Sequence, residues 1–174
     1  SDLVVKADLT PSTLELAPVA WSKPPGPRAS AELTVEFQGD QVQRIRGLRV
    51  AAPGLSFDGA VDFTGPAWVV DVAAAGLGET RLSGRVRPER TGYAATLRGP
   101  LLDLGRLIET GALDGAGAAG GGAPAGGQAI RLDARFDRVL LGQGRELVGV
   151  AVLLDLDGRG RRQVRAEGRL ARGG

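Results

Sequence analysis

The residue types that most often carry catalysis or bind metal ions are scarce in this chain. It has no Cys and no His, which excludes thiol nucleophiles, disulfides, His-based acid–base chemistry and zinc sites of the usual Cys/His kind. Two carboxylate pairs remain, Asp133 with Asp137 and Asp155 with Asp157, and paired carboxylates are what glycoside hydrolysis uses. Alternation along each segment puts both members of a pair on a polar, exposed face. We therefore predict no catalytic residue and no enzyme activity.

Three further patterns were weighed as binding sites. Asp155, Asp157 and Gly158 resemble the start of a calcium loop, but the run of oxygen ligands and the closing Glu are missing. The glycine-rich stretch 115–122 lacks the Gly-Lys-Ser/Thr ending of a phosphate-binding loop. Lys and Arg total 22 against 20 Asp and Glu, a formal charge of +2, which predicts no nucleic-acid partner. We therefore expect neither a metal site nor a cofactor.

Most of the chain alternates apolar and polar residues with a period of two, which is typical of β-strands with one apolar and one polar face. A slip in the alternation between Val42 and Ile45 predicts a β-bulge. The run 147–156 is almost continuously apolar and is expected to be covered on both faces. The predicted strands fall in 3–9, 12–16, 19–22, 31–37, 42–50, 55–63, 68–74, 82–86, 93–97, 130–136, 147–156 and 164–170.

One segment departs from this pattern. Apolar residues recur there at spacings of three and four: Leu101, Leu102, Leu104, Leu107 and Ile108. This spacing predicts a short amphipathic helix, with Asp103 at its start and Gly111 at its end. Residues 112–128 are nearly all Ala and Gly, so we predict a flexible loop there. The predicted organisation is a β-groove segment over 1–111, this loop, and a continuation of the same sheet over 129–174.

A glycine recurs on the apolar side of several predicted strands, between two apolar neighbours. It stands at Gly59, Gly84, Gly99 and Gly168. Glycine weakens a strand unless the sheet bends or something approaches closely, so its recurrence in successive hairpins predicts a sheet curled across its width. The result is a trough with an apolar floor. The residues predicted to line that floor are Leu33, Val35, Phe37, Leu55, Phe57, Val61, Phe63, Trp68, Val70, Val72, Leu82, Val86, Leu132 and Phe136.

The order and spacing of several stretches resemble the AsmA-like proteins of the bacterial envelope, the group that includes TamB and YhdP. Asp103-Leu104 follows Leu97-Arg98-Gly99 and precedes Leu107-Ile108-Glu109, and 132–140 leads through 144–147 into the next strand. The same pattern also fits Lys23, Gly26 and the stretches 33–37 and 45–50. The resemblance therefore covers most of the chain. The Ala/Gly-rich stretch departs from it and looks like a local insertion.

The resemblance implies a fold, a function and a location. It implies a mainly β fold with a curved antiparallel sheet, a taco-like open groove, and one short helix. It implies a section of a periplasmic conduit that carries phospholipid or another acyl lipid between the inner and outer membranes. The whole protein would be anchored in the inner membrane, with possible envelope protein partners. The chain begins at Ser1 without Met, which suggests a fragment of a longer protein.

Two other interpretations stand beside this one. Alternating strands on their own more often form a closed sandwich or barrel core. In that case the chain would be a scaffold domain in outer-membrane or envelope assembly that binds no ligand. An enzyme is the third interpretation, and only generic carboxylates support it.

Overall fold

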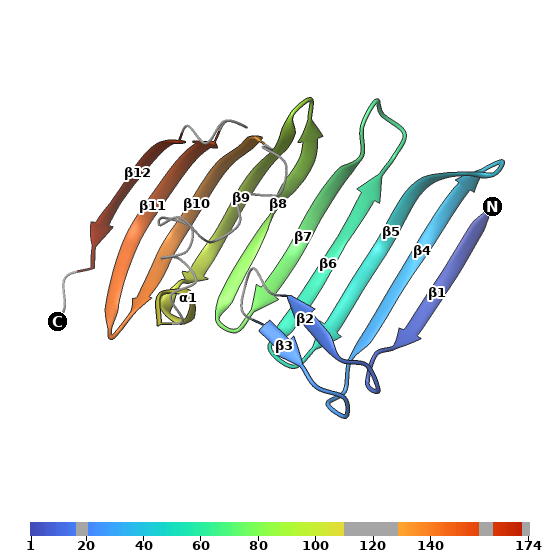
Figure 1. Cartoon of the computed structure of the whole chain (residues 1–174), viewed down its shortest axis with the longest axis horizontal. Coiled ribbons are helices and arrows are strands. Elements are labelled where there is room, and N and C mark those ends of the chain that lie inside the picture. The colour runs from blue at the N-terminus through green and yellow to red at the C-terminus, as the bar shows by residue number, and fades with distance from the viewer. Residues whose placement is uncertain (17–20, 110–128, 157–161, 172–174) are drawn as a thin grey trace.

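A single curved and open ten-stranded β-sheet forms most of the structure (Figure 1). The computed structural model describes residues 1–16, 21–109, 129–156 and 162–171. In spatial order the strands are β1 (Asp2–Asp8), β4 (Ser30–Gln38), β5 (Gln41–Ala52), β6 (Leu55–Asp62), β7 (Val69–Leu77), β8 (Thr80–Glu89), β9 (Gly92–Asp103), β10 (Ala129–Gly142), β11 (Arg145–Leu156) and β12 (Arg162–Leu170). The mainly β, open and curved fold expected from the sequence is therefore confirmed.

Neighbouring strands are antiparallel throughout, except that β9 and β10 run parallel. Parallel neighbours require a crossover connection, because the chain must return to the end from which it started. Here the connection between Asp103 and Ala129 provides it, and it begins with the helix α1 (Gly105–Glu109). The strands after this connection thus extend the sheet formed before it.

A short hairpin, β2 (Leu14–Leu16) and β3 (Trp21–Lys23), lies in front of the lower ends of the central strands (Figure 1). The Trp21 indole N–H donates to Pro53 O at 3.1 Å, which ties the hairpin to the turn between β5 and β6. Lys23 is 2% exposed, and its ammonium donates to the carbonyls of Thr10, Ser12 and Pro24 at 2.9–3.1 Å. These contacts fix the hairpin against one end of the sheet.

A row of β-bulges crosses the middle of the sheet, in every second strand. The pairing register shifts at Gly47 in β5, between Val72 and Ala75 in β7, near Gly99 in β9 and at Gly149 in β11. Gly47 and Gly149 have φ of +57° and +61°, a region that favours glycine. Each bulge adds a residue to one strand and bends it, so a row of bulges curls the sheet along one line.

The glycines of the recurrent motif lie along the same line. A Cβ on Gly59 would approach Asp71 O at 2.5 Å, and a Cβ on Gly84 or Gly99 would overlap the backbone carbonyl of Thr96 or Arg81. Neighbouring strands therefore approach closely at these three glycines, and the curved sheet predicted from the recurrent glycines is confirmed. The bulge predicted between Val42 and Ile45 is also present, as a register shift opposite Glu36 and Phe37.

The sheet is largely a single layer with little interior. The chain exposes 11497 Å², whereas a compact monomer of 17.9 kDa exposes about 8,000 Å². One buried cluster, Ala134, Phe136, Val139 and Val150, lies between β10 and β11 and packs against Leu104 beside α1. The closed sandwich or barrel considered for this sequence is not the fold that forms.

Two local predictions were wrong. Leu101 and Leu102 belong to β9, and the helix begins only at Gly105, because β9 keeps pairing with β10 as far as Asp103. The β11 run is not covered on both faces, since Leu153 is 50% exposed on the side that carries Asp133 and Arg165. Asp103 does accept the Gly105 N–H at 2.8 Å at the helix start. Gly111 and the predicted loop 112–128 lie outside the described residues.

Candidate functional site

One face of the sheet is apolar from the first strand to the last. Paired residues form a row through all ten strands with no polar side chain in it: Leu3, Val35, Ile45, Val61, Val70, Val86, Ala95, Leu132, Leu154 and Val164. A second row nearer the bulges contains Leu48, Gly59, Val72, Gly84, Leu97, Ala134, Val152 and Ala166. We call this surface the apolar face.

The structure brings the predicted floor residues together on the apolar face. Phe63 and Trp68 lie in the connection between β6 and β7, and the other predicted residues lie in strands. Among the predicted floor residues Phe136 alone is buried, at 5% exposed, because it belongs to the cluster under β10 and β11. The apolar row is partly buried or exposed, from Leu3, which is 52% exposed, to Val164, which is 57% exposed.

Val72 has a glycine partner in both neighbouring strands. Its partner on one side is Gly59 and on the other side Gly84, so no side chain flanks it in either neighbouring strand. The bulges keep the apolar residues of a strand on the apolar face on both sides of the bulge row. Because Gly47 is the extra residue in β5, Ile45 and Leu48 both face the apolar side although they are three positions apart.

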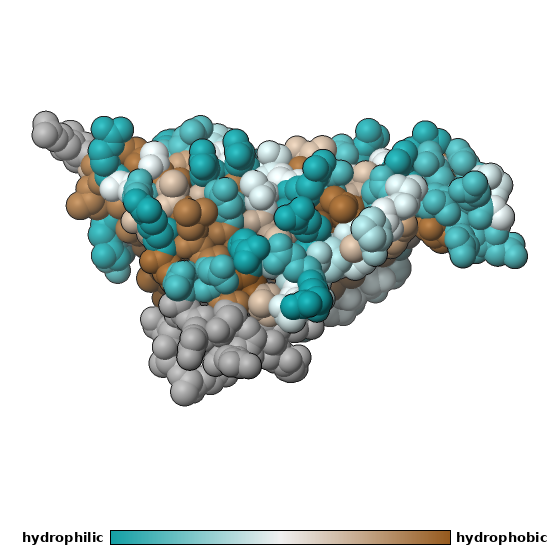
Figure 2. Space-filling view, turned by 90° about the horizontal axis from the view of Figure 1, so that it is seen from above, coloured by the Kyte–Doolittle hydropathy of each residue, from teal (hydrophilic) through white to brown (hydrophobic). Residues whose placement is uncertain are grey.

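The opposite face carries ionic pairs that link consecutive strands. Arg46 lies 2.8 Å from Asp2 and 2.8 Å from Glu36, and Arg44 lies 2.8 Å from Asp62 and 3.9 Å from Glu36. Viewed from above, hydrophilic side chains line the upper long side of the molecule, and hydrophobic ones gather below them, mostly toward the left (Figure 2). Further pairs on this charged face are Arg49–Asp58, Arg85–Asp71, Arg131–Glu89, Arg131–Asp155 and Arg138–Glu146.

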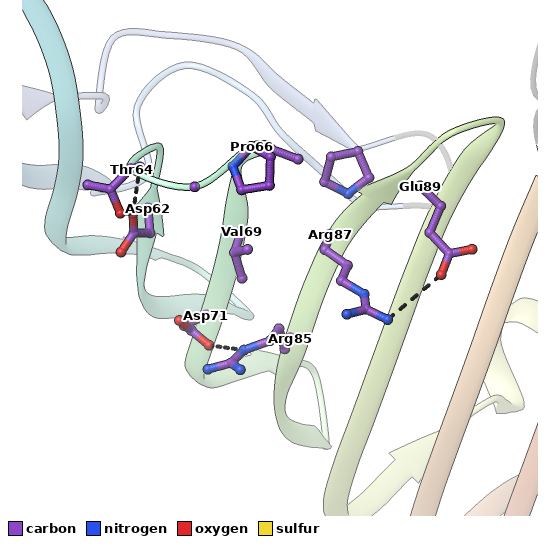
Figure 3. Close-up of a pocket in the computed structure, with 11 residues that line it drawn as sticks. Asp62, Thr64, Pro66, Val69, Asp71, Arg85, Arg87 and Glu89 are labelled. Atoms are coloured by element: carbon purple, nitrogen blue, oxygen red, sulfur yellow. Dashed lines mark hydrogen bonds and ion pairs between the residues drawn. The ribbon is translucent and has the colours of Figure 1, made fainter.

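A pocket of about 520 Å³ opens on the charged face, beneath the connection between β6 and β7 (Figure 3). Its charged groups pair with one another: Arg85 Nε lies 2.6 Å from Asp71 Oδ1, and Arg87 Nη2 lies 3.8 Å from Glu89 Oε1. Because each of these arginines already faces a carboxylate, the pocket offers an anionic ligand little net positive charge. It does not make a convincing binding site.

Asp62 shapes the rim of that pocket. Its Oδ1 accepts hydrogen bonds from both the backbone N–H and the hydroxyl of Thr64. These bonds, followed by the bond from Arg44, lower the pKa of the Asp62 carboxyl to about 2. Asp62 is therefore a turn-stabilising carboxylate and not a proton donor near neutral pH.

A second pocket, of about 310 Å³, lies where the β2–β3 hairpin meets the apolar face. Leu16 of β2 stands over the ends of β6, β7, β8 and β9. We call it the hairpin pocket, and its apolar lining residues are Leu16, Leu55, Phe57, Ala75, Leu77, Leu82 and Leu102. Leu55, Phe57 and Leu82 were predicted floor residues, whereas Leu16, Leu77 and Leu102 were not. Only the tertiary position of the hairpin reveals them.

The opposite end of the apolar face is lined by aromatic residues. Phe37 ends β4, Phe63 follows β6, Trp68 precedes β7 and Tyr93 begins β9, all at the end of the sheet away from the hairpin. The rings of Trp68 and Tyr93 lie 6.0 Å apart between centroids and are tilted by 39°. We call these four residues the aromatic rim. The sequence prediction included three of them but not Tyr93.

Of the two carboxylate pairs considered for catalysis, only Asp133 and Asp137 lie wholly within the described residues. Asp133 Oδ1 lies 3.7 Å from Arg135 Nε, and Asp137 is exposed. Asp157 and Gly158 lie outside the described residues. In the described part of the chain no three His, Cys, Asp or Glu side chains come close enough to hold a metal ion. No helix among the described residues is long and apolar enough to cross a membrane.

Comparison of the chain with protein-family models, with curated proteins and with solved structures found no match. The class of the protein is therefore defined by its fold and its two faces: a one-layer, open, curved β-sheet with one apolar and one charged face.

Proposed function

We propose that this chain is a section of a lipid conduit and binds acyl chains along its apolar face. The observation that carries the proposal is the row from Leu3 to Val164, which crosses all ten strands without a polar side chain. A surface of this kind in a monomer marks a place for another apolar molecule. Phospholipid is the abundant molecule with chains of matching chemistry.

The size of the face suits acyl chains. Ten strands at about 4.8 Å spacing span about 43 Å, and the nine residues of β7 extend about 30 Å. One acyl chain covers about 15 Å, half of a hydrocarbon core of roughly 30 Å. Each methylene that the face shields from water contributes about 0.8 kcal/mol. The face therefore has room for several chains and a substantial driving force to hold them.

The two faces also support movement along the sheet. The apolar row contains no hydrogen-bonding side chain, so nothing on it would fix a chain at one position. The charged face is unsuitable for hydrocarbon, because it carries ionic pairs from β1 to β12. A lipid would therefore lie on one side of the sheet only, and neighbouring positions along that side would be similar in energy.

The proposal extends to the place of the whole protein in the cell. On the resemblance to AsmA-like proteins, we place the chain in the periplasm as part of an inner-membrane-anchored protein. Its ligand would be phospholipid on the way between the two membranes. Envelope proteins would be its partners at the ends of the conduit.

The test is native mass spectrometry with lipid extraction on the chain purified from bacterial cells. We expect phospholipid to co-purify and to appear as a mass increment on the folded protein. A lipid-free protein that also takes up no phospholipid from added vesicles would contradict the proposal.

The two sheet edges favour a second candidate function, a scaffold in envelope assembly. Within the described residues β1 and β12 end the sheet, and each has a strand edge available for pairing. Val4 of β1 is 58% exposed and Leu170 of β12 is 71% exposed. Cross-linking from cysteines placed on β1 and β12 to an envelope protein, together with lipid-free mass spectra, would favour the scaffold.

A further inference from the structure

The two ends of the apolar face differ, and the difference gives the bound lipid a direction. This inference rests on the proposed function. We infer that a phospholipid lies along the strands with its glycerol and headgroup at the aromatic rim and its acyl chains running toward the bulge row.

The hairpin residues at one end of the face have their polar side-chain groups already bonded within the protein. Leu16 stands over the strand ends there, and the Trp21 indole N–H is already bonded to Pro53 O. The three donors of the Lys23 ammonium are occupied by backbone carbonyls, and the side chain is 2% exposed. No polar group of these residues is left for a phosphate or glycerol.

The rim end has the composition of a hydrocarbon–water boundary. Four of the seven aromatic residues, counted from two Trp, one Tyr and four Phe, lie there. Tyr93 is 39% exposed and Phe63 is 40% exposed, so the rim is open to a ligand. Trp and Tyr favour the level of glycerol and headgroup in a bilayer, because one end of each ring system is apolar and the other is polar.

The strand ends beyond the rim are polar. The connection after β6 includes Thr64, and the turn between β8 and β9 includes Arg90, which is exposed. Arg87 and Glu89 line the charged pocket beside this turn (Figure 3). A headgroup at the rim would thus meet water and charged side chains, while its chains lie over Val70 and Val72.

The length of an acyl chain agrees with this placement. A chain of about 15 Å that starts at Trp68 covers four or five residues of an extended strand, which brings its methyl end near Val72. Val72 pairs with Gly59 on one side and Gly84 on the other, so the methyl end would lie beside the bulge row. Trp21, at the far end of the face, would lie beyond the reach of the chain.

The chain's two tryptophans make the inference testable, because they mark opposite ends of the face. The Trp21→Phe variant retains Trp68, and the Trp68→Phe variant retains Trp21. Each is loaded from vesicles of phosphatidylcholine that carries bromine either near the glycerol end or near the methyl end of one acyl chain. Mass spectrometry measures how much lipid each sample holds, and circular dichroism checks that each variant is folded.

We expect glycerol-proximal bromine to quench Trp68 roughly twofold more than methyl-terminal bromine, given the depth at which Trp residues lie in bilayers. Trp21 should be quenched little by either lipid. If loaded protein shows stronger quenching of Trp68 by methyl-terminal bromine, or equal quenching of both tryptophans, the orientation is wrong while lipid binding stands. If no variant takes up lipid, the proposed function fails along with the orientation.

Discussion

Val69 and Val70 are consecutive in the chain but face opposite sides of the sheet. Val70 pairs with Val61 and Val86 in the apolar row, whereas Val69 lines the charged pocket with Asp71 and Arg85 (Figure 3). The two side chains have the same size and both are partly buried. They therefore form a matched pair of positions for separating the function of one face from that of the other.

The first prediction uses this pair. Val70→Glu should reduce co-purifying lipid on the order of tenfold or more, because an unpaired carboxylate against hydrocarbon costs several kcal/mol. Val69→Glu should retain lipid at the level of the parent chain, since its new carboxylate would lie near Arg85 and Arg87. Lipid extraction from both variants, with circular dichroism as a folding check, measures the difference. Equal retention by both variants would show that the apolar face does not hold the lipid.

The second prediction concerns the ammonium that holds the hairpin. Lys23→Met should lower the free energy of unfolding by roughly 3 kcal/mol, because it removes a buried ammonium and leaves three partly buried carbonyls without their donor. Lys6→Met is the control, since the Lys6 side chain is 73% exposed and faces only Glu32 at 3.5 Å. Urea denaturation followed by Trp21 emission, in chains that also carry Trp68→Phe, measures both. A Lys23→Met variant as stable as the Lys6→Met variant would show that the three hydrogen bonds do not anchor the hairpin.

The third prediction tests the glycines in the bulge row. Gly84→Ala should destabilise the sheet by about 1–3 kcal/mol, because the new methyl group would overlap Thr96 O and lie 2.9 Å from Leu97 Cδ2. Gly65→Ala should change stability by less than about 0.5 kcal/mol, since its nearest atom, Ala67 O, lies at 3.5 Å. Thermal unfolding of the two variants compares them. An unchanged midpoint for Gly84→Ala would mean that strands β8 and β9 do not approach closely at this point.

The fourth prediction is the titration of Asp62. Its pKa is lowered to about 2 from the usual value of 3.8 for an aspartate, so its contribution to stability is present above 3.8 and is lost as the pH falls through about 2. Thr64→Ala removes the largest cause and should raise the pKa toward 3.8 more than Arg44→Gln does. Carbon-detected NMR titration of the carboxyl measures each variant. A larger shift in Arg44→Gln would show that the ionic pair, not the turn, controls Asp62.

Much of the local structure follows from the sequence because its causes are local. Alternation from 31 to 37 and from 130 to 136 predicts strands with two unlike faces, and β4 and β10 have them. The recurrent glycines predict a curved sheet, which is confirmed, and the strands approach closely at Gly59 and Gly84. The fourteen-residue floor was predicted from the same alternation, and its strand residues share one face. Lipid binding at that face stays a prediction.

Other features depend on which strands meet. A slip of one residue in pairing would turn every side chain of a strand to the opposite face, so a continuous apolar face exists only because each register is set correctly. The bulge at Gly47 was not foreseen, although the three-residue spacing from Ile45 to Leu48 was its signal. The parallel contact of β9 with β10 was not foreseen either, since it follows from the path of a long connection.

The sequence by itself determined that this protein forms strands with one apolar and one charged side, because a period of two acts between neighbours in the chain. Only the tertiary structure decided that ten strands join into one open sheet, that Leu16 lines a pocket at one end of the apolar face, and that Phe37, Phe63, Trp68 and Tyr93 all lie at the other end. Those arrangements depend on pairings between residues far apart in the chain, such as Leu132 with Ala95. Such pairings are selected by the free energy of the whole sheet and leave no local pattern in the sequence.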